Sequence, residues 1–154
     1  MSRRDQIRMS DAEVLSFLDE QRTVTCATNG RDGWPHLMPL WYVVRDGQLW
    51  SWTYAKSQKV RNLERDERVT LQVEAGETYD QLRGVMLRAR AVIHRDTDAV
   101  AALGTEIFTR YAGGHELDEG TRAMVVAQAA KRVGLQFVEE ARVTWDHRKL
   151  GGVY

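Results

Sequence analysis

Eleven residues near the middle of the chain, Lys56 to Asp66, carry the charges best placed for chemistry. The cations Lys56, Lys59 and Arg61 stand at the start of a short predicted helix, whereas its acidic residues stand near the end. A helix macrodipole prefers the opposite order by about 0.3–1 kcal/mol per charge. A bound anion removes the conflict, because free backbone N–H groups and nearby cations together hold phosphate. The segment therefore predicts a phosphate site; the alternative is a solvated helix with random charge order.

Aromatic residues gather just before this helix. Trp41, Trp50 and Trp52 occur with Tyr42 and Tyr54 in the preceding stretch of chain. A flat ring that carries a phosphate tail fits an aromatic surface beside a basic helix. Aromatic residues alone are more often explained by core and interface packing, and it is their position next to the helix that favours a ligand.

Other catalytic signals are weak. The chain contains no Gly-x-Gly-x-x-Gly motif, no phosphate-binding loop ending in Gly-Lys-Ser/Thr and no Gly-x-Ser-x-Gly elbow. The four histidines are scattered, so no metal site is predicted. Cys26 lies in the middle of a predicted strand and is interpreted as a small buried residue rather than a nucleophile. No catalytic side chain is assigned, and any difficult chemistry would come from a cofactor.

Composition limits the function classes. The 154 residues are expected to form one domain, residues 1–154. Lysine plus arginine number 22 and aspartate plus glutamate 22, so net charge gives no argument for a nucleic acid or membrane partner. The single cysteine excludes an internal disulfide and fits a reducing compartment. No segment resembles a signal peptide or a membrane span of about 20 apolar residues, so a soluble, cytoplasmic protein is expected.

Helices and strands are expected to alternate along the chain. A capping box at Ser10 and Glu13 opens a helix that ends near Gln21, and Ser57 is the expected N-cap of the basic helix. Further helices are predicted over 97–111 and 119–132. The predicted strands cover 22–28, 34–44, 48–54, 67–74, 82–95 and 134–145. Six strands in mostly consecutive hairpin order favour an antiparallel sheet closed into a small β-barrel with helices (α+β).

The predicted strand 34–44 is apolar on both faces. One face carries Leu37, Trp41 and Val43, and the other carries Met38, Leu40, Tyr42 and Val44. A strand of this kind has to be covered on both sides, and the inside of one barrel covers only one. A helix, a second subunit or an aromatic ligand would cover the other.

These residues together resemble the pyridoxamine 5′-phosphate oxidase-like superfamily. The resemblance covers about residues 10–95 and depends on a strand ending in Trp52-Thr53, then Ser57-x-Lys59, a short helix, and the strand that begins near Arg68. The tail over 145–152 also looks like the ends of actinobacterial members. The resemblance implies a six-stranded antiparallel split β-barrel of FMN-binding-like type, and a homodimer with two cofactor sites at the subunit interface.

The resemblance to the vitamin B6 oxidases themselves is partial. Their phosphate is held by a tyrosine-threonine pair at the strand end, which falls on Trp52-Thr53 here, and by a helix lysine, which falls on Lys59. Their Arg-x-Val-Leu-Leu-Lys strand corresponds to residues 37–42, where both charges are missing and Leu37 replaces the phosphate-binding arginine. A flavin-contacting glutamine is replaced by Gly84. These departures argue against vitamin B6 oxidase activity.

The chain is more similar to the branch that binds the deazaflavin coenzyme F420. That branch has Pro-x-Trp-Tyr/Phe on this strand and Lys-x-Arg-Asn in the helix, and this chain has both. The resemblance implies ring contacts from Met38, Pro39, Leu40 and Trp41, phosphate contacts from Thr53, Ser57, Lys59, Arg61 and Asn62, and second choices Lys56 and Gln58.

The implied activity is that of a homodimeric F420-dependent reductase acting on a small planar or apolar molecule. One alternative is an FMN-dependent oxidoreductase of the same fold. Another is a protein without catalytic activity that binds a flavin, a deazaflavin or haem. The neutral charge of the chain disfavours a nucleic-acid-binding barrel.

Overall fold

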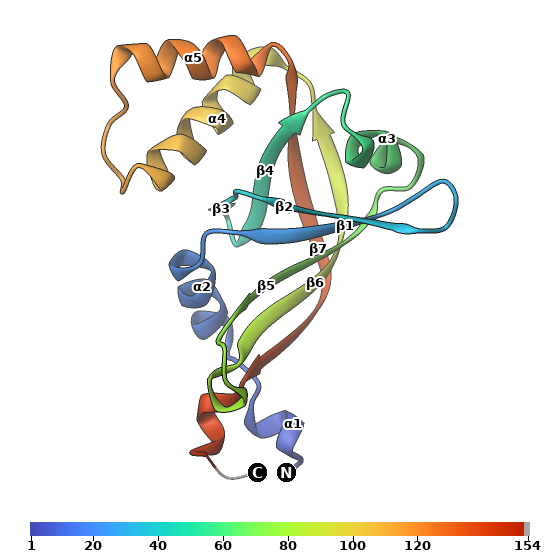
Figure 1. The fold of residues 1–154 in the computed structure, drawn as a ribbon, viewed down its shortest axis with the longest axis vertical. Coiled ribbons are helices and arrows are strands. Elements are labelled where there is room, and N and C mark those ends of the chain that lie inside the picture. Colours follow the sequence, from blue (N-terminus) through green and yellow to red (C-terminus); the bar gives the residue numbers. More distant parts are fainter. Residues whose placement is uncertain (153–154) are drawn as a thin grey trace.

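The computed structural model describes residues 1–152 and contains a curled antiparallel sheet with helices at its ends and sides (Figure 1). In chain order the elements are α1 (Arg3–Gln6), α2 (Asp11–Glu20), β1 (Val24–Asn29), β2 (Pro35–Leu40), β3 (Val43–Arg45), β4 (Gln48–Tyr54), α3 (Gln58–Arg65), β5 (Arg68–Ala75), η1 (Tyr79–Gln81), β6 (Arg83–His94), α4 (Thr97–Tyr111), α5 (Glu119–Ala129), β7 (Arg132–Asp146) and η2 (His147–Leu150). The predicted helices over 97–111 and after Ser57 are confirmed, and α5 ends earlier than expected.

The sheet has seven strands in the order β2-β1-β5-β6-β7-β4-β3, with each neighbouring pair antiparallel. The prediction of an antiparallel barrel-like sheet with helices is confirmed, but the count of six strands is wrong. The predicted strand 34–44 is two strands, β2 and β3, interrupted at Trp41 and Tyr42. Because β2 and β3 form opposite edges of the sheet, this short connection brings the edges together and curls the sheet into a half-barrel.

The interruption between β2 and β3 is held by side chains from elsewhere in the chain. The carbonyl oxygen of Trp41 accepts a hydrogen bond from Ser51 Oγ at 2.6 Å. The Tyr42 N–H donates to Tyr111 Oη at 3.0 Å, and the Tyr42 carbonyl accepts from Arg110 Nη1 at 3.0 Å. Main-chain groups that leave a strand ladder need such partners when they are buried. Strand β4 and helix α4 therefore fix the bend.

Arg110 also ties this bend to helix α2. Its Nη2 donates to the carbonyls of Leu18, Asp19 and Gln21 at 2.9, 3.1 and 2.7 Å. The hydroxyl of the fully buried Tyr42 donates to the Leu18 carbonyl at 2.5 Å. The last carbonyls of a helix lack partners within the helix and carry partial negative charge, which a guanidinium satisfies. One arginine thus joins α4, the C-terminus of α2 and the bend.

Two apolar clusters lie on opposite faces of the sheet. The barrel interior is filled by inward side chains of the strands and by α2, including Val14, Phe17, Leu71, Leu87 and Phe137. The outer face of β4 is covered by α4 and α5 through Trp52, Leu103, Ile107 and Val125. Gly104 permits the close packing of α4, since a Cβ built there would lie 2.3 Å from the Trp52 ring.

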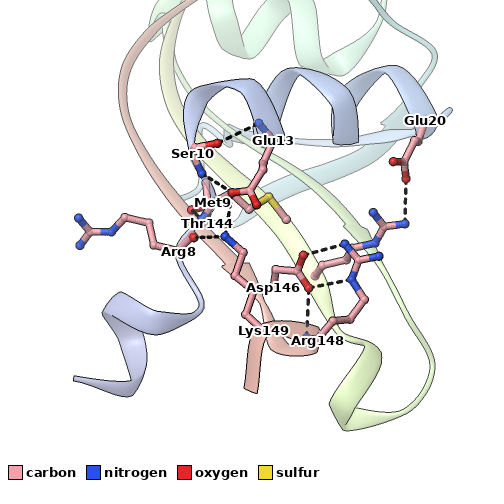
Figure 2. A network of polar contacts seen from close by, with 10 residues as sticks. Arg8, Met9, Ser10, Glu13, Glu20, Thr144, Asp146, Arg148 and Lys149 are labelled. Carbon is pink, nitrogen blue, oxygen red and sulfur yellow. Dashed lines mark hydrogen bonds and ion pairs between the residues drawn. The ribbon is translucent and has the colours of Figure 1, made fainter. Parts of the chain in front are cut away.

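The two ends of the described chain meet at the narrow end of the half-barrel (Figure 1). Figure 2 shows the polar network there: Lys149 Nζ donates to Glu13 Oε2 and to the Arg8 carbonyl, each at 2.8 Å. Glu13 also completes the predicted capping box with Ser10. The buried carboxylate of Asp146 accepts two hydrogen bonds from the Arg148 guanidinium and one from the Arg148 N–H, which lower its pKa. The tail after β7 is therefore docked against the start of the chain.

We expect the substitution Arg110→Ala to lower the free energy of unfolding by about 2–4 kcal/mol, since several partly buried carbonyls lose a charged donor. Urea unfolding followed by circular dichroism measures this change. Arg122→Ala is the control, because its ion pair with Glu116 is exposed and should contribute far less. Equal losses in the two variants would contradict the role assigned to Arg110.

Candidate cofactor site

The centre of the candidate site is the buried side chain of Lys59. Strand β4 ends at Tyr54, and a tight turn leads directly into α3, which places Lys59 over the end of the strand. Lys59 Nζ donates to Thr53 Oγ1 at 3.0 Å, and the lysine is only 7% exposed. The structure thus brings together Thr53 and Lys59, two of the residues for which the resemblance implies phosphate contacts.

Lys59 is a buried cation without a counter-ion. Among residues 1–152 its only hydrogen-bond partner is Thr53, and no carboxylate pairs with it. Burial lowers the pKa of Lys59, and the positive charge of Arg132 lowers it further. An unpaired buried charge is costly in free energy unless an anion or several hydrogen bonds compensate it. Among the described residues, the surroundings of Lys59 therefore contain no anion that balances its charge.

The start of α3 supplies further unused hydrogen-bond donors. Ser57 occupies the N-cap position as predicted, but its side chain makes no capping hydrogen bond. Its Oγ is buried and has no partner within the described part of the chain. The first turn of α3 contains no acidic residue, so its backbone N–H groups face no negative side chain. Ser57, Lys59 and this helix end together suit a phosphate group.

The rest of the predicted phosphate set lies on another side of α3. Asn62 is fully buried; its Nδ2 donates to Thr28 Oγ1 at 3.0 Å, and its Oδ1 accepts from Gln58 Nε2 at 2.9 Å. Arg61 and Lys56 are exposed and have no side-chain partner among residues 1–152. Gln58, Arg61 and Asn62 thus occupy a different face of the helix from Lys59.

Cys26 connects the phosphate residues to the predicted ring-contacting strand. Burial raises the pKa of its thiol to about 12, and Lys59 is close enough to oppose this shift. In the β1–β2 ladder Cys26 pairs with Met38, so these two side chains share a face. Met38 is 44% exposed and therefore borders the Lys59 region from an open strand edge. Cys26 is fully buried, which confirms its interpretation as a small buried residue, and the raised pKa of its thiol disfavours a thiolate nucleophile at neutral pH.

The other predicted ring contacts lie along the same edge of the sheet. Pro39 is exposed, and Leu40 is partly buried against the barrel core. The Trp41 ring stacks on Tyr111, with ring centroids 4.2 Å apart and planes 12° apart, yet remains 47% exposed. The bend that closes the half-barrel thus also orients an aromatic surface next to β2.

The tail residue His147 lies away from this site. Its Nδ1 is 3.0 Å from the Tyr79 carbonyl oxygen, and the two rings meet edge to face. Both residues belong to the narrow end of the half-barrel, whereas α3 lies near the other end (Figure 1).

Two residues of this region, Arg65 at the end of α3 and His36 in β2, were missed by the sequence analysis. Arg65 follows Arg61 at helical spacing, a signal that the sequence contained but that was not used. His36 has a buried Nδ1 without a partner among the described residues, and no local pattern marks it. Within residues 1–152, no group of three histidine, cysteine or acidic side chains is arranged to hold a metal ion. No described helix is long and apolar enough to cross a bilayer.

Comparisons with known proteins bear on the family and the fold of the chain. The chain is similar over its full length to a solved structure of the conserved hypothetical protein Rv2991 from Mycobacterium tuberculosis, with 43% identity, 95% of that chain covered and a TM-score of 0.90. A structure named F420 Reductase matches with a TM-score of 0.66 and 23% identity, covering 82% of this chain and 93% of the other.

A third structure, the heme storage protein HutZ from Vibrio cholerae, has a TM-score of 0.67 and 16% identity, covering 86% of this chain and 92% of the other. These last two likenesses concern the fold alone. No protein with a curated description matches significantly. The family profile described as "Pyridoxamine 5'-phosphate oxidase" matches residues 10–145. With the half-barrel and the Thr53–Lys59 pair, this match shows that the chain belongs to the pyridoxamine 5′-phosphate oxidase family.

Proposed function

We propose that this protein is an oxidoreductase that uses coenzyme F420 to reduce a small planar or apolar organic molecule. The observation that carries the proposal is that Lys59 is a buried cation with no counter-ion among the described residues, two positions after Ser57, whose buried hydroxyl also has no partner in that range. A phosphate bound there satisfies both groups. The cofactor supplies hydride transfer when bound, and the residues of this chain supply binding and orientation.

The residues available at the site support a binding and orienting role. Thr53, Ser57 and Lys59 would hold the phosphate, and Met38 and Trp41 would present an apolar surface to the ring. The Cys26 thiol stays protonated at neutral pH. Catalysis would therefore depend on proximity and on a fixed approach of substrate to ring.

The choice of F420 over FMN depends on charge and on the F420-type motifs of the chain, Pro39 to Tyr42 and Lys59 to Asn62. The presence of Leu37 where the oxidases have an arginine supports F420 over FMN less strongly than the sequence resemblance implied. Leu37 pairs with Ala27 and faces away from Cys26 and Lys59, so an arginine there would point away from the phosphate residues of its own subunit. FMN remains the second candidate cofactor, because its phosphate suits the same three residues.

The apolar surface of β2 supports a homodimer. Leu37 in β2 is 57% exposed and Trp34, just before the strand, is 77% exposed, and β2 is an edge strand whose free side has no partner within residues 1–152. Apolar edge strands are prone to association, and a twofold partner covers the same patch on both subunits. We include this dimer in the proposal, with the cofactor sites close to the interface.

Replacement of Lys59 by alanine should weaken F420 binding by about 1.5–3 kcal/mol, or roughly ten- to a hundredfold, because a charged hydrogen bond to phosphate is lost. Fluorescence titration measures the affinity. The melting temperature of the cofactor-free protein should not fall, since the variant removes an uncompensated buried charge. Lys131→Ala is the control for general charge effects. A variant with lower stability and unchanged affinity would show that Lys59 is structural.

Light scattering at micromolar concentration should give about twice the mass of one chain. The substitution Leu37→Glu should shift the protein toward monomers, because it places a charge on the proposed interface. Leu15→Glu is a matched control on the exposed side of α2, where 47% of the leucine is accessible. A wild-type monomer with full cofactor affinity would exclude an interface site.

At low salt we expect F420 to bind at least about tenfold more tightly than FMN, and this ratio should shrink as salt rises. The reason is that Lys56 and Arg61 are exposed cations that can attract a longer anionic tail, whereas both cofactors use Lys59. Parallel titrations of the two cofactors at several salt concentrations test this. Equal or tighter FMN binding would favour the flavin alternative.

A further inference from the structure

Helix α3 presents a second polar face to a cavity. Gln58, Arg61, Asn62 and Arg65 follow the i, i+3, i+4, i+7 spacing of one helix face, while Lys59 lies on another. This face forms one wall of a cavity of about 670 Å³, and the turn between β1 and β2 forms the opposite wall. Figure 1 shows the tip of the β1–β2 hairpin beside α3.

The cavity is lined by more cations than anions. Arg31 and Arg61 have no side-chain partner within residues 1–152. Arg65 donates to the Asn29 carbonyl at 2.6 Å and to no carboxylate in that range. The single acidic residue of the lining, Asp32, accepts a hydrogen bond from the Trp34 N–H at 3.0 Å. Three guanidinium groups thus surround a space with one carboxylate.

The lining also contains an unsatisfied buried nitrogen, His36 Nδ1. Several arginines elsewhere on the described chain have carboxylate partners, as when Arg68 pairs with Asp66 at 2.8 Å and Arg45 pairs with Glu106 at 2.6 Å, whereas no arginine that lines this cavity does. Unpaired arginines that converge on a space large enough for a ligand group are the arrangement that recognises carboxylate or phosphate oxygens.

We propose that this cavity is a second anion subsite, separate from the Lys59 region, and that it takes a carboxylate or phosphate group. The residues that define it are Arg31, Arg61 and His36, with Arg65 shaping its wall. The group belongs either to the tail of the cofactor that Lys59 holds or to a separate small anion. In the first case the inference rests on the proposed function.

The double variant Arg31→Gln/Arg61→Gln tests the subsite, and Arg3→Gln/Arg4→Gln is the control. The control removes the same charge from exposed positions in α1, at the far end of the half-barrel (Figure 1). Calorimetry with inorganic tripolyphosphate measures anion binding without any cofactor. Fluorescence titration with F420 that has several glutamates, and with F420 that has none, measures the effect of the tail. Thermal unfolding checks that both variants are folded.

We expect tripolyphosphate to bind about five- to tenfold more weakly to the Arg31/Arg61 variant than to the control. If the loss for F420 is confined to the glutamate-bearing form, the subsite holds the cofactor tail. If tripolyphosphate alone loses affinity, the subsite takes a separate anion. Unchanged affinity for all three probes overturns the subsite. Failure of the wild type to bind F420 contradicts the proposed function, while the tripolyphosphate experiment still decides the subsite.

Discussion

The bend at Trp41 and Tyr42 is the constraint on which the rest of this structure depends. The two edges of the sheet meet only because the chain leaves one edge and enters the other within two residues. Such a break exposes main-chain groups, and side chains of Ser51, Arg110 and Tyr111 satisfy them. The helices that supply or receive these hydrogen bonds are thereby placed relative to the sheet. Next to these contacts, the Trp41 ring stacks on Tyr111 of α4.

Much of the fold was predictable because its signals are local. The capping box at Ser10, the helical periodicity over 97–111 and the alternation in β6 each depend on neighbouring residues. The break between β2 and β3 was not predictable, since the run of apolar residues continues without interruption through Trp41 and Tyr42. The partners that make the break possible include Arg110 and Tyr111, which lie 68 and 69 positions further along the chain. The strand count was wrong for this reason.

The candidate site, like the fold, was predictable from the sequence only in part. Lys59 and Thr53 were placed from a short motif, and the structure brings them to within 3.0 Å of each other. That Lys59 is buried without a counter-ion among the described residues is a property of the packed chain, which no spacing reveals. The two faces of α3 follow from helical periodicity, but the cavity against one of them requires the β1–β2 hairpin to fold back beside the helix.

The uncompensated charge of Lys59 links anion binding to proton binding. Burial lowers the pKa of this amine in the folded protein, so the folded state holds its proton less tightly than the unfolded chain does. The free protein is therefore stabilised as pH rises from the lowered pKa toward the ordinary lysine value, where the unfolded chain still carries the proton. An anion beside the amine raises the pKa again. Above the lowered pKa, each binding event then takes up protons from solution, and the affinity for the anion decreases as pH rises.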